Sequence, residues 1–199
     1  MPITLNGSGT VTGISAGGLP DGIIQSADLA TGVGGKILQV KQAVKTDTSS
    51  TTSTSFITIP GTDESGSGSE FEVNITPSAT SSKILVTWNI HFAVPAGIYS
   101  GGTRLRRDTT TIFVGDTSSS RTRATNWVVG WNSHGGRNPW SIGGTYLDSP
   151  NTTSATTYSI QYMSGYNAST VYINQGYLWD DAAPVGLCPS SITCQEIAA

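Results

Sequence analysis

Large apolar residues occupy every second position of the segment 83–94, and no other feature restricts the fold of this chain so strongly. The apolar members are Ile84, Val86, Trp88, Ile90, Phe92 and Val94. Successive side chains of a β-strand point to opposite faces of a sheet, so this spacing places all six on one face. A strand with one apolar face is typical of an antiparallel sheet that packs on a second layer.

Further segments with strand character follow along the chain, and turns rich in Gly, Ser, Asn and Pro separate them. The predicted strands cover 37–44, 56–59, 71–75, 83–94, 103–107, 111–115, 121–131, 140–147, 156–164, 169–175 and 190–197. Loops are predicted at 47–55 and 61–70, which consist mainly of Ser, Thr, Gly and acidic residues. Regularly spaced short strands are typical of sandwiches and jelly rolls. The sequence therefore predicts an all-β head over residues 37–199, an antiparallel β-sandwich of jelly-roll-like type.

Residues 1–36 differ from the rest of the chain, because nine glycines separate their few apolar residues. A single helical turn at 26–30, capped by Ser26, is the only helix that the pattern suggests. These apolar residues are too sparse to bury one another within one chain. We therefore expect an extended anchor segment that becomes ordered against other copies, in a trimer, or against a partner. The residues expected to anchor it are Ile3, Leu5, Val11, Ile14 and Leu19.

Side chains that could carry out catalysis are scarce. Charged residues make up 12% of the chain, about half of the roughly 25% of an ordinary domain. His91 has the parity opposite to the apolar face of its strand, which favours a polar or inter-subunit surface position. His134 lies in a predicted loop, where binding an anion together with Arg137 is the alternative to simple solvation. No nucleophile, zinc or phosphate-loop motif occurs, so we predict no enzyme, no cofactor and no metal site.

The charge pattern argues against nucleic acid as a partner. The formal net charge is −3, whereas a nucleic-acid-binding surface is strongly basic. The arginines are expected on a solvated strand face; they are Arg104, Arg106, Arg107, Arg121 and Arg123. The carboxylates of Asp63, Glu64 and Glu70 lack the ligand spacing of a calcium loop, so an exposed, mobile tip is expected there.

Neither a membrane span nor a signal peptide is predicted. No apolar run approaches the ~20 residues that cross a bilayer, and the first residues lack a charged and then apolar leader. Synthesis in the cytoplasm is therefore expected. Cys188 and Cys194 allow two alternatives, a disulfide across a turn or two reduced thiols, and cytoplasmic synthesis favours the second.

One aromatic cluster suggests a binding surface for sugars. It comprises Trp127, Trp131, Trp140 and Tyr146, with Arg137 and several asparagines between them. Flat aromatic faces stack on sugar rings while amides and hydroxyl groups bind the sugar hydroxyls. The alternative, favoured by the pattern alone, is that these rings pack in the core or at a subunit interface.

Several segments resemble structural proteins of tailed bacteriophages, particularly fibre and tail-associated proteins of marine and cyanobacterial phages. They are 3–7, 17–22, 34–40, 56–61, 75–86, 144–162 and 191–197. The resemblance implies a homotrimer with β-sandwich heads and an N-terminal anchor, exposed on the virion. It covers most of the chain, but its motifs are structural and identify the kind of protein better than its task.

The expected function is attachment. In the leading hypothesis the chain is a short trimeric tail fibre, located in the virion after synthesis in the bacterial cytoplasm. Residues 1–36 would bind other virion proteins, and the head would contact a host glycan or receptor. The alternative is a capsid decoration or cement protein, or a head fibre, that stabilises the shell.

Overall fold

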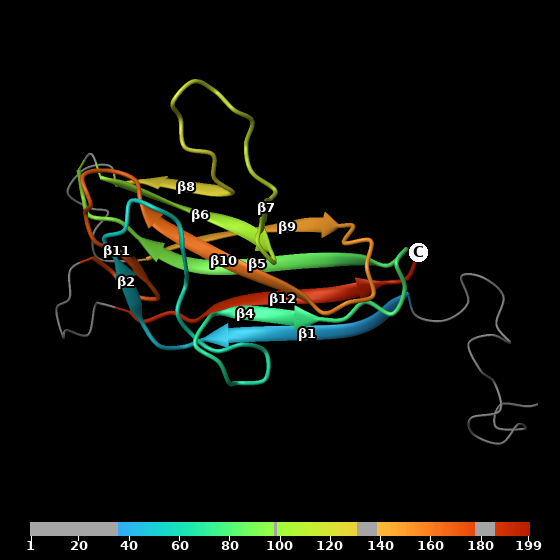
Figure 1. The fold of residues 1–199 in the computed structure, drawn as a ribbon. Helices are drawn as coiled ribbons and strands as arrows, with labels where there is room; N and C mark the ends of the chain where they lie inside the picture. Colours follow the sequence, from blue (N-terminus) through green and yellow to red (C-terminus); the bar gives the residue numbers. More distant parts are fainter. Residues whose placement is uncertain (1–35, 98, 131–138, 178–185) are drawn as a thin grey trace, which may run out of the picture. The chain divides into compact units, whose positions relative to one another are not determined.

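Two antiparallel sheets pack face to face in the computed structural model, which describes residues 36–97, 99–130, 139–177 and 186–199 (Figure 1). These residues form twelve strands: β1 (Ile37–Lys45), β2 (Ser49–Thr51), β3 (Ile57–Thr58), β4 (Glu72–Ile75), β5 (Lys83–Ala93), β6 (Ser100–Arg107), β7 (Thr110–Ile112), β8 (Asn126–Val129), β9 (Trp140–Asp148), β10 (Thr156–Ser164), β11 (Val171–Ile173) and β12 (Ser190–Ile197). The described part contains no helix. The prediction of an all-β antiparallel fold is confirmed for this part of the chain.

The first sheet, sheet A, is built around the long strand β5. One edge of β5 pairs first with β12 and then, at Phe92 and Ala93, with β11. Its other edge pairs with β9 along nine residue positions, from Ile84 to Phe92. Outside β12 and β11 lie β1 and β2, respectively. Sheet A is thus four strand positions wide, and two of these positions are each made of two short strands in line.

The second sheet, sheet B, has the same width. At its centre β10 pairs with β6 on one edge and with β3 and β4 on the other. Beyond β6 lie β7 and β8, which pair with different parts of it. Residues 37–199 belong to one compact unit. Residues 1–35 lie outside the described residues, so the boundary at residue 36, the turn at 26–30 and the five anchoring residues stay predictions.

The core lies between the sheets and follows the predicted alternation. All six apolar residues of the segment 83–94 are buried, with at most 2% of their surface exposed. From sheet B, Tyr158, Ile160 and Tyr162 of β10 point toward them and are equally buried. Burying large aromatic and branched side chains of this kind contributes roughly 1.5–3 kcal/mol each. This packing fixes which side of each strand faces outward.

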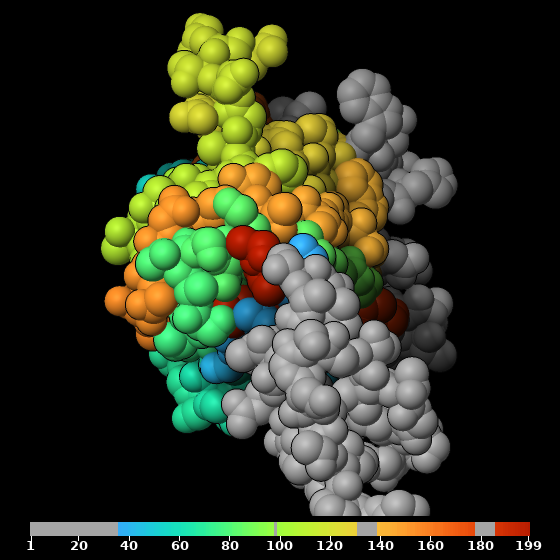
Figure 2. Space-filling view, turned by 90° about the vertical axis from the view of Figure 1, so that its right-hand side faces the viewer, coloured from blue at the N-terminus to red at the C-terminus, as the bar shows by residue number. Residues whose placement is uncertain are grey.

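The predicted loop 47–55 contains a strand that the composition did not suggest. Ser49, Ser50 and Thr51 form β2, which pairs with β11. The segment has no apolar alternation, but an available partner edge decides whether a short segment pairs. Conversely, residues 113–125 are largely a loop that stands out from the sandwich between β7 and β8, yellow-green in Figures 1 and 2. Of the predicted strand 121–131, residues 121–125 therefore belong to this loop, and the strand β8 begins at Asn126.

The loop 61–70 is exposed over residues 65–70, as predicted for a tip, and its own carboxylates form hydrogen bonds that connect it internally and to the sandwich. Asp63 accepts hydrogen bonds from the backbone N–H groups of Ser65 and Ser67 at 2.9 and 3.1 Å. Glu64 folds back onto the sandwich, where it accepts a bond from the Asn74 N–H at 2.8 Å and pairs with Lys41 at 3.2 Å. Its side chain is only 14% exposed. Local hydrogen bonds and one ion pair thus hold this loop.

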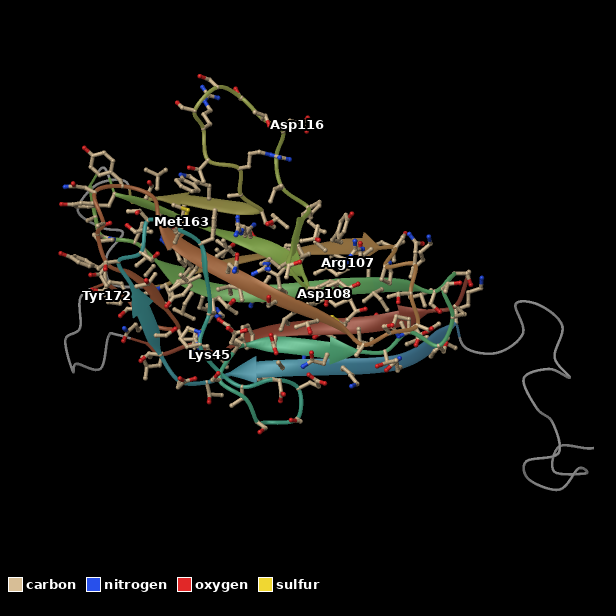
Figure 3. All side chains as sticks on the ribbon, viewed as in Figure 1. Lys45, Arg107, Asp108, Asp116, Met163 and Tyr172 are labelled. Atoms are coloured by element: carbon tan, nitrogen blue, oxygen red, sulfur yellow. The ribbon has the colours of Figure 1, made fainter. Side chains whose placement is uncertain are left out.

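The two ends of the sandwich carry different features. Ile37 pairs with Ile197, and Ile197 pairs with Lys83, so the first described strand begins beside the carboxyl end of the chain. The opposite end holds the end of β5, the start of β6 and the strands β2 and β11, at the left in Figure 1. Figure 3 labels Tyr172 at that same end. The eleven residues of β5 separate the two ends by roughly 35 Å.

Candidate functional site

A cleft of about 250 Å³ opens at the end of the sandwich that is remote from Ile37. We call it the tyrosine cleft. Its lining residues are Pro95, Tyr99, Asn167, Ser169, Thr170, Tyr172 and Tyr177. They come from the loop between β5 and β6, the loop between β10 and β11, and the segment after β11. Three stretches that are distant in the sequence therefore meet at one place.

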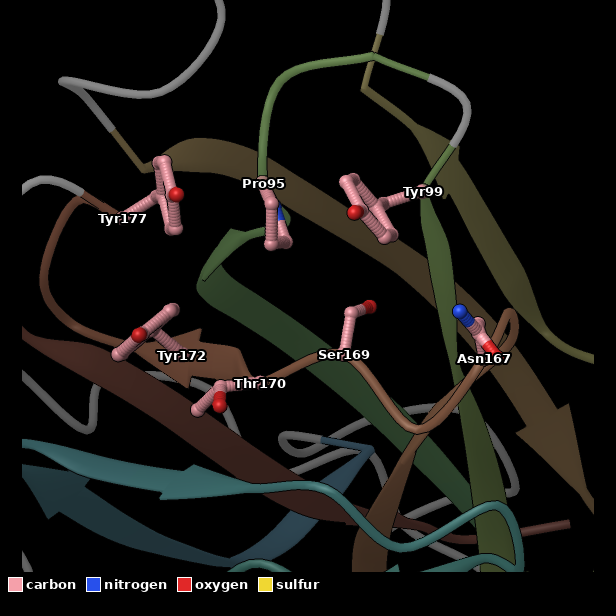
Figure 4. A pocket seen from close by; sticks show the side chains of 7 residues that line it. All are labelled: Pro95, Tyr99, Asn167, Ser169, Thr170, Tyr172 and Tyr177. Atoms are coloured by element: carbon pink, nitrogen blue, oxygen red, sulfur yellow. The ribbon is translucent and has the colours of Figure 1, made fainter.

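The side chains line the cleft from two sides, as Figure 4 shows. Tyr177, Pro95 and Tyr99 lie along one side. Along the other side lie Tyr172, Thr170, Ser169 and Asn167. The rings of Tyr172 and Tyr177 meet edge to face with their centroids 6.3 Å apart. The cleft thus offers aromatic faces together with an amide and two hydroxyl groups.

The sandwich core positions these aromatic residues. Val171 and Ile173 are buried, so Tyr172 between them must point outward from β11. Pro95 follows the buried Val94, at the point where the chain leaves the core. Tyr99 is held from behind, because its carbonyl oxygen accepts a hydrogen bond from the Gly130 N–H at 2.8 Å. The adjoining strands therefore fix the positions of cleft side chains that would be mobile if only their loops held them.

A tight turn supplies the amide of the cleft. The Ser169 N–H donates to the Tyr166 carbonyl at 3.2 Å, and both residues between them have positive φ, 53° at Asn167 and 48° at Ala168. This combination is typical of a type I′ turn. Asn adopts such a conformation readily, whereas Ala does so at a cost of roughly 1 kcal/mol. Strain of this kind is often found where a loop must present a side chain.

The described lining of the cleft is polar, and none of its seven residues carries a charge. No described residue hydrogen-bonds the hydroxyl groups of Tyr99, Tyr172 or Tyr177. Among the described residues, no three His, Cys, Asp or Glu side chains come together as metal ligands. The described segments also include no helix that is long and apolar enough to cross a membrane.

Two described members of the predicted aromatic cluster are open to solvent, Trp127 at 41% and Trp140 at 38% exposure. Trp127 lies on the outward face of β8, because the neighbouring Val128 fills the inward position. One face of its indole rests directly on Gly102 and Gly165. Together with Arg121 and Thr122 it lines a hollow of about 320 Å³. Trp127 is therefore placed as a stacking surface and is not among the lining residues of the tyrosine cleft.

The other predicted members do not share the face of Trp127. Trp140 lies opposite Phe92 and Tyr146 opposite Val86, which puts both on the inward side of β9. Tyr146 packs against the core, with its ring 4.9 Å from that of Phe113. Trp131 and Arg137 lie outside the described residues, as does His134. Glycan binding by Trp127, Trp131, Arg137, Trp140 and Tyr146 stays a prediction.

The arginines are less solvated than expected. Arg107 enters the end of the sandwich and donates two hydrogen bonds to the buried Asp148, at 2.8 and 3.0 Å. Burial works against its charge, but the Asp148 carboxylate outweighs this and raises the pKa of Arg107. Arg104 donates from Nε to Gln161 at 2.7 Å and lies 4.5 Å over the Phe56 ring. The prediction that the arginines lie on a solvated strand face is therefore wrong for Arg107, whereas Arg104 lies on the outward face of β6 and is half-buried.

The cysteines and the described histidine have structural surroundings. Both Cys188 and Cys194 are free thiols, and Cys194 is buried in the core, where burial raises the pKa of its thiol. His91 is half-buried, and its Nδ1 lies 2.8 Å from the Pro189 carbonyl oxygen. Neither feature brings a base next to a nucleophile.

Sequence reasoning missed all seven residues of the tyrosine cleft. Tyr99, Tyr172 and Tyr177 lie in or next to different strands and far apart in the sequence. The sequence alone therefore does not reveal that they meet. One local signal was present, because Tyr166 to Ser169 has the polar composition of a turn. No protein-family model matches the chain, and no curated protein matches it.

Proposed function

We propose that this chain is a virion structural protein of a tailed bacteriophage, a short trimeric fibre whose β-sandwich head contacts the host surface. The tyrosine cleft is the contact site, and its ligand is a neutral saccharide. Residues 1–36 anchor the chain to the particle. The observation that carries this proposal is the tyrosine-lined cleft, uncharged in its described lining, at the end of the sandwich remote from Ile37.

The lining of the cleft matches the chemistry of a sugar. Sugar rings present C–H faces that stack on aromatic rings, and their hydroxyl groups exchange hydrogen bonds with amides and hydroxyl groups. The cleft provides both kinds of group, from Tyr99, Tyr172 and Tyr177 and from Asn167, Ser169 and Thr170. Since none of the described lining residues is charged, the lining favours a neutral sugar over an acidic one. Modest affinity per head suffices, because several copies on one particle raise the avidity.

The position of the cleft supports the same function. The described part of the chain starts at the end where Ile37 pairs with Ile197. An anchor that precedes Ile37 therefore joins the head at one end, while the cleft lies at the other. A head fixed to a particle in this way presents its cleft to an approaching surface.

The order of the strands supports a head of the jelly-roll type. When β1 with β2, β3 with β4, β7 with β8 and β11 with β12 each count as one position, the twelve strands give eight. The chain changes sheet at every connection between these positions except the one from β6 to β7. The first position pairs with the last, through β1 and β12. Eight antiparallel strands wound in this manner are a feature of jelly rolls.

The experiment is a competition for host adsorption. Purified full-length protein is added to host cells before particles that carry the chain, and the adsorbed particles are counted. The wild-type protein is expected to reduce adsorption, and the variant Tyr99→Ala/Tyr172→Ala, with its fold verified by circular dichroism, is expected to have lost this effect. Equal competition by both proteins would refute the cleft as contact site. Particles that lack the chain but adsorb normally and release their DNA on heating would instead identify a cement protein.

A further inference from the structure

The outward face of sheet A exposes several aliphatic side chains, although a sheet face in contact with water usually carries polar ones. At the end near the carboxyl terminus the exposed fractions are 55% for Ile37, 48% for Leu38, 55% for Val40 and 52% for Leu147. Val44, farther along β1, is 45% exposed. Because directly paired residues share a face, Val40, Gln195, Leu85 and Leu147 form one row across all four strand positions.

The rest of this face consists of small polar residues. The next rows are Gln42, Thr193, Thr87 and Thr145, and then Val44, Ser191, Asn89 and Gly143. Several of these side chains already bond to one another, such as Gln42 to Thr193 at 2.8 Å and Ser141 to Asn89 at 2.6 Å. Across these three rows, no described residue is Asp, Glu, Lys or Arg; Lys83 stands at the border, where it donates to Ser149.

The outward face of sheet B is different. It carries Glu72 on β4 and both Arg104 and Arg106 on β6, the two strands that flank β10, where Ser159 lies between Glu72 and Arg106. Both faces belong to the same sandwich, so the lack of charge on sheet A is a property of that face and not of the composition alone. Depletion of charged residues together with exposed aliphatic side chains is typical of the centre of a protein interface.

The face is large enough for a stable contact. Four strand positions at roughly 4.8 Å spacing and about 30 Å of strand length give a projected area of about 600 Å². The accessible area is larger than this projected area, because the side chains make the surface uneven. A stable interface buries roughly 800 Å² on each partner. The outward face of sheet A supplies an area of this order if nearly all of it is covered.

We propose that identical copies of this chain associate through the outward face of sheet A. The occupants are the same faces of the other two copies of a trimer, because the face is without charge in its central rows, so three identical faces pack around a common axis without electrostatic repulsion. Hydroxyl and amide groups at the centre can exchange partners across the contact, and the aliphatic row loses its contact with water. This inference rests on the trimer of the proposed function and places the contact that forms it between the heads.

The test is the mass of the full-length protein in solution, measured by light scattering during size exclusion. The wild-type protein is expected at three times the chain mass of 20.7 kDa. Val40→Glu and Thr87→Arg each place a charge in this face on every copy, and both variants are expected at 20.7 kDa. Two positions on different strands guard against a local failure to fold, which circular dichroism detects.

Val129→Glu is the matched control. Val129 is also an exposed strand valine, 42% accessible, but it lies on the outward face of sheet B. This variant is expected to keep the wild-type mass. A monomeric wild-type protein, or an oligomer that survives both Val40→Glu and Thr87→Arg, would overturn the inference. The saccharide affinity of the monomeric variants, measured separately for one head, is expected to be unchanged, so a failure of the cleft proposal is distinguishable from a failure of this one.

Discussion

The side-chain amide of Asn174 donates a hydrogen bond of 2.8 Å to the carbonyl oxygen of Lys45, although 129 residues separate the two in the chain. The same amide donates to the Asp47 carbonyl at 2.8 Å, and its oxygen accepts a bond from the Ser190 hydroxyl at 2.5 Å. Asn174 follows β11, and Lys45 ends β1. One buried side chain thus satisfies the backbone at the point where two strand positions of sheet A are interrupted.

Replacing Asn174 by Ala is therefore expected to lower the free energy of unfolding by about 3 kcal/mol, because two carbonyl groups and one hydroxyl lose their partner. The measurement is urea unfolding followed by circular dichroism. Asn151→Ala is the control, since Asn151 has a similar positive φ of 54° but is exposed. The control isolates the backbone strain, expected at about 1 kcal/mol. Equal losses in both variants would contradict the bonding role of Asn174.

The carboxylate of Glu196 predicts how stability depends on pH. Burial raises the pKa of this group, but hydrogen bonds from the Ser78 hydroxyl, Gln39 and the Ser78 N–H outweigh burial and lower the pKa to about 2, from an ordinary 4.5. Its stabilising effect is therefore complete above pH 4.5 and disappears as the pH falls toward 2. Glu196→Gln is expected to cost about 2 kcal/mol at pH 7 and almost nothing near pH 2. A difference between variant and wild type that does not change between these pH values would refute this assignment.

Gly144 leaves room for the indole of Trp88. A Cβ atom at this position would lie 2.6 Å from Cζ2 of that ring. Gly144→Ala is expected to destabilise the protein by about 2 kcal/mol, because the buried Trp88 has no space to move aside. Gly115→Ala serves as the control, since no atom lies within 4 Å of a Cβ there. Thermal unfolding of both variants measures the difference, and equal melting temperatures would contradict the close packing.

The turn at the tyrosine cleft predicts a stabilising change. Ala168 has a φ of 48°, so Ala168→Gly relieves strain, although glycine also adds freedom to the unfolded chain. The net effect is expected to be a gain of about 0.5 kcal/mol with saccharide binding retained. Ala79→Gly, in an exposed turn without positive φ, is expected to destabilise by a similar amount. A loss of stability in Ala168→Gly would show that the turn is unstrained.

The alternation of side chains predicted the strands that have strong apolar faces. The predicted ranges 156–164 and 190–197 coincide with β10 and β12, and 83–94 exceeds β5 by one residue. The pairing of these strands was not predictable, because any apolar face can in principle cover any other. For the same reason β2 was missed, since Ser49 to Thr51 become a strand only through β11.

The candidate site was less predictable than the fold. The Trp127 prediction rested on residues close together in sequence, and strand parity then distributed them over different faces. The tyrosine cleft depends on Tyr99, Tyr172 and Tyr177 meeting at one end of the sandwich. Only the register of β5, β6, β10 and β11 brings these ends together, and the register is a property of the whole sandwich.

The central claim is that the tyrosine cleft binds a neutral saccharide, and binding of the purified full-length protein to a glycan array tests it most directly. We expect the wild-type protein and Trp127→Ala to bind the same neutral saccharides, and Tyr99→Ala/Tyr172→Ala to lose this binding at least tenfold. Tyr172→Phe measures how much the hydroxyl group of Tyr172 contributes to saccharide binding. Binding that is lost in Trp127→Ala but kept in the cleft variant, or no saccharide binding by the wild-type protein, would contradict the claim.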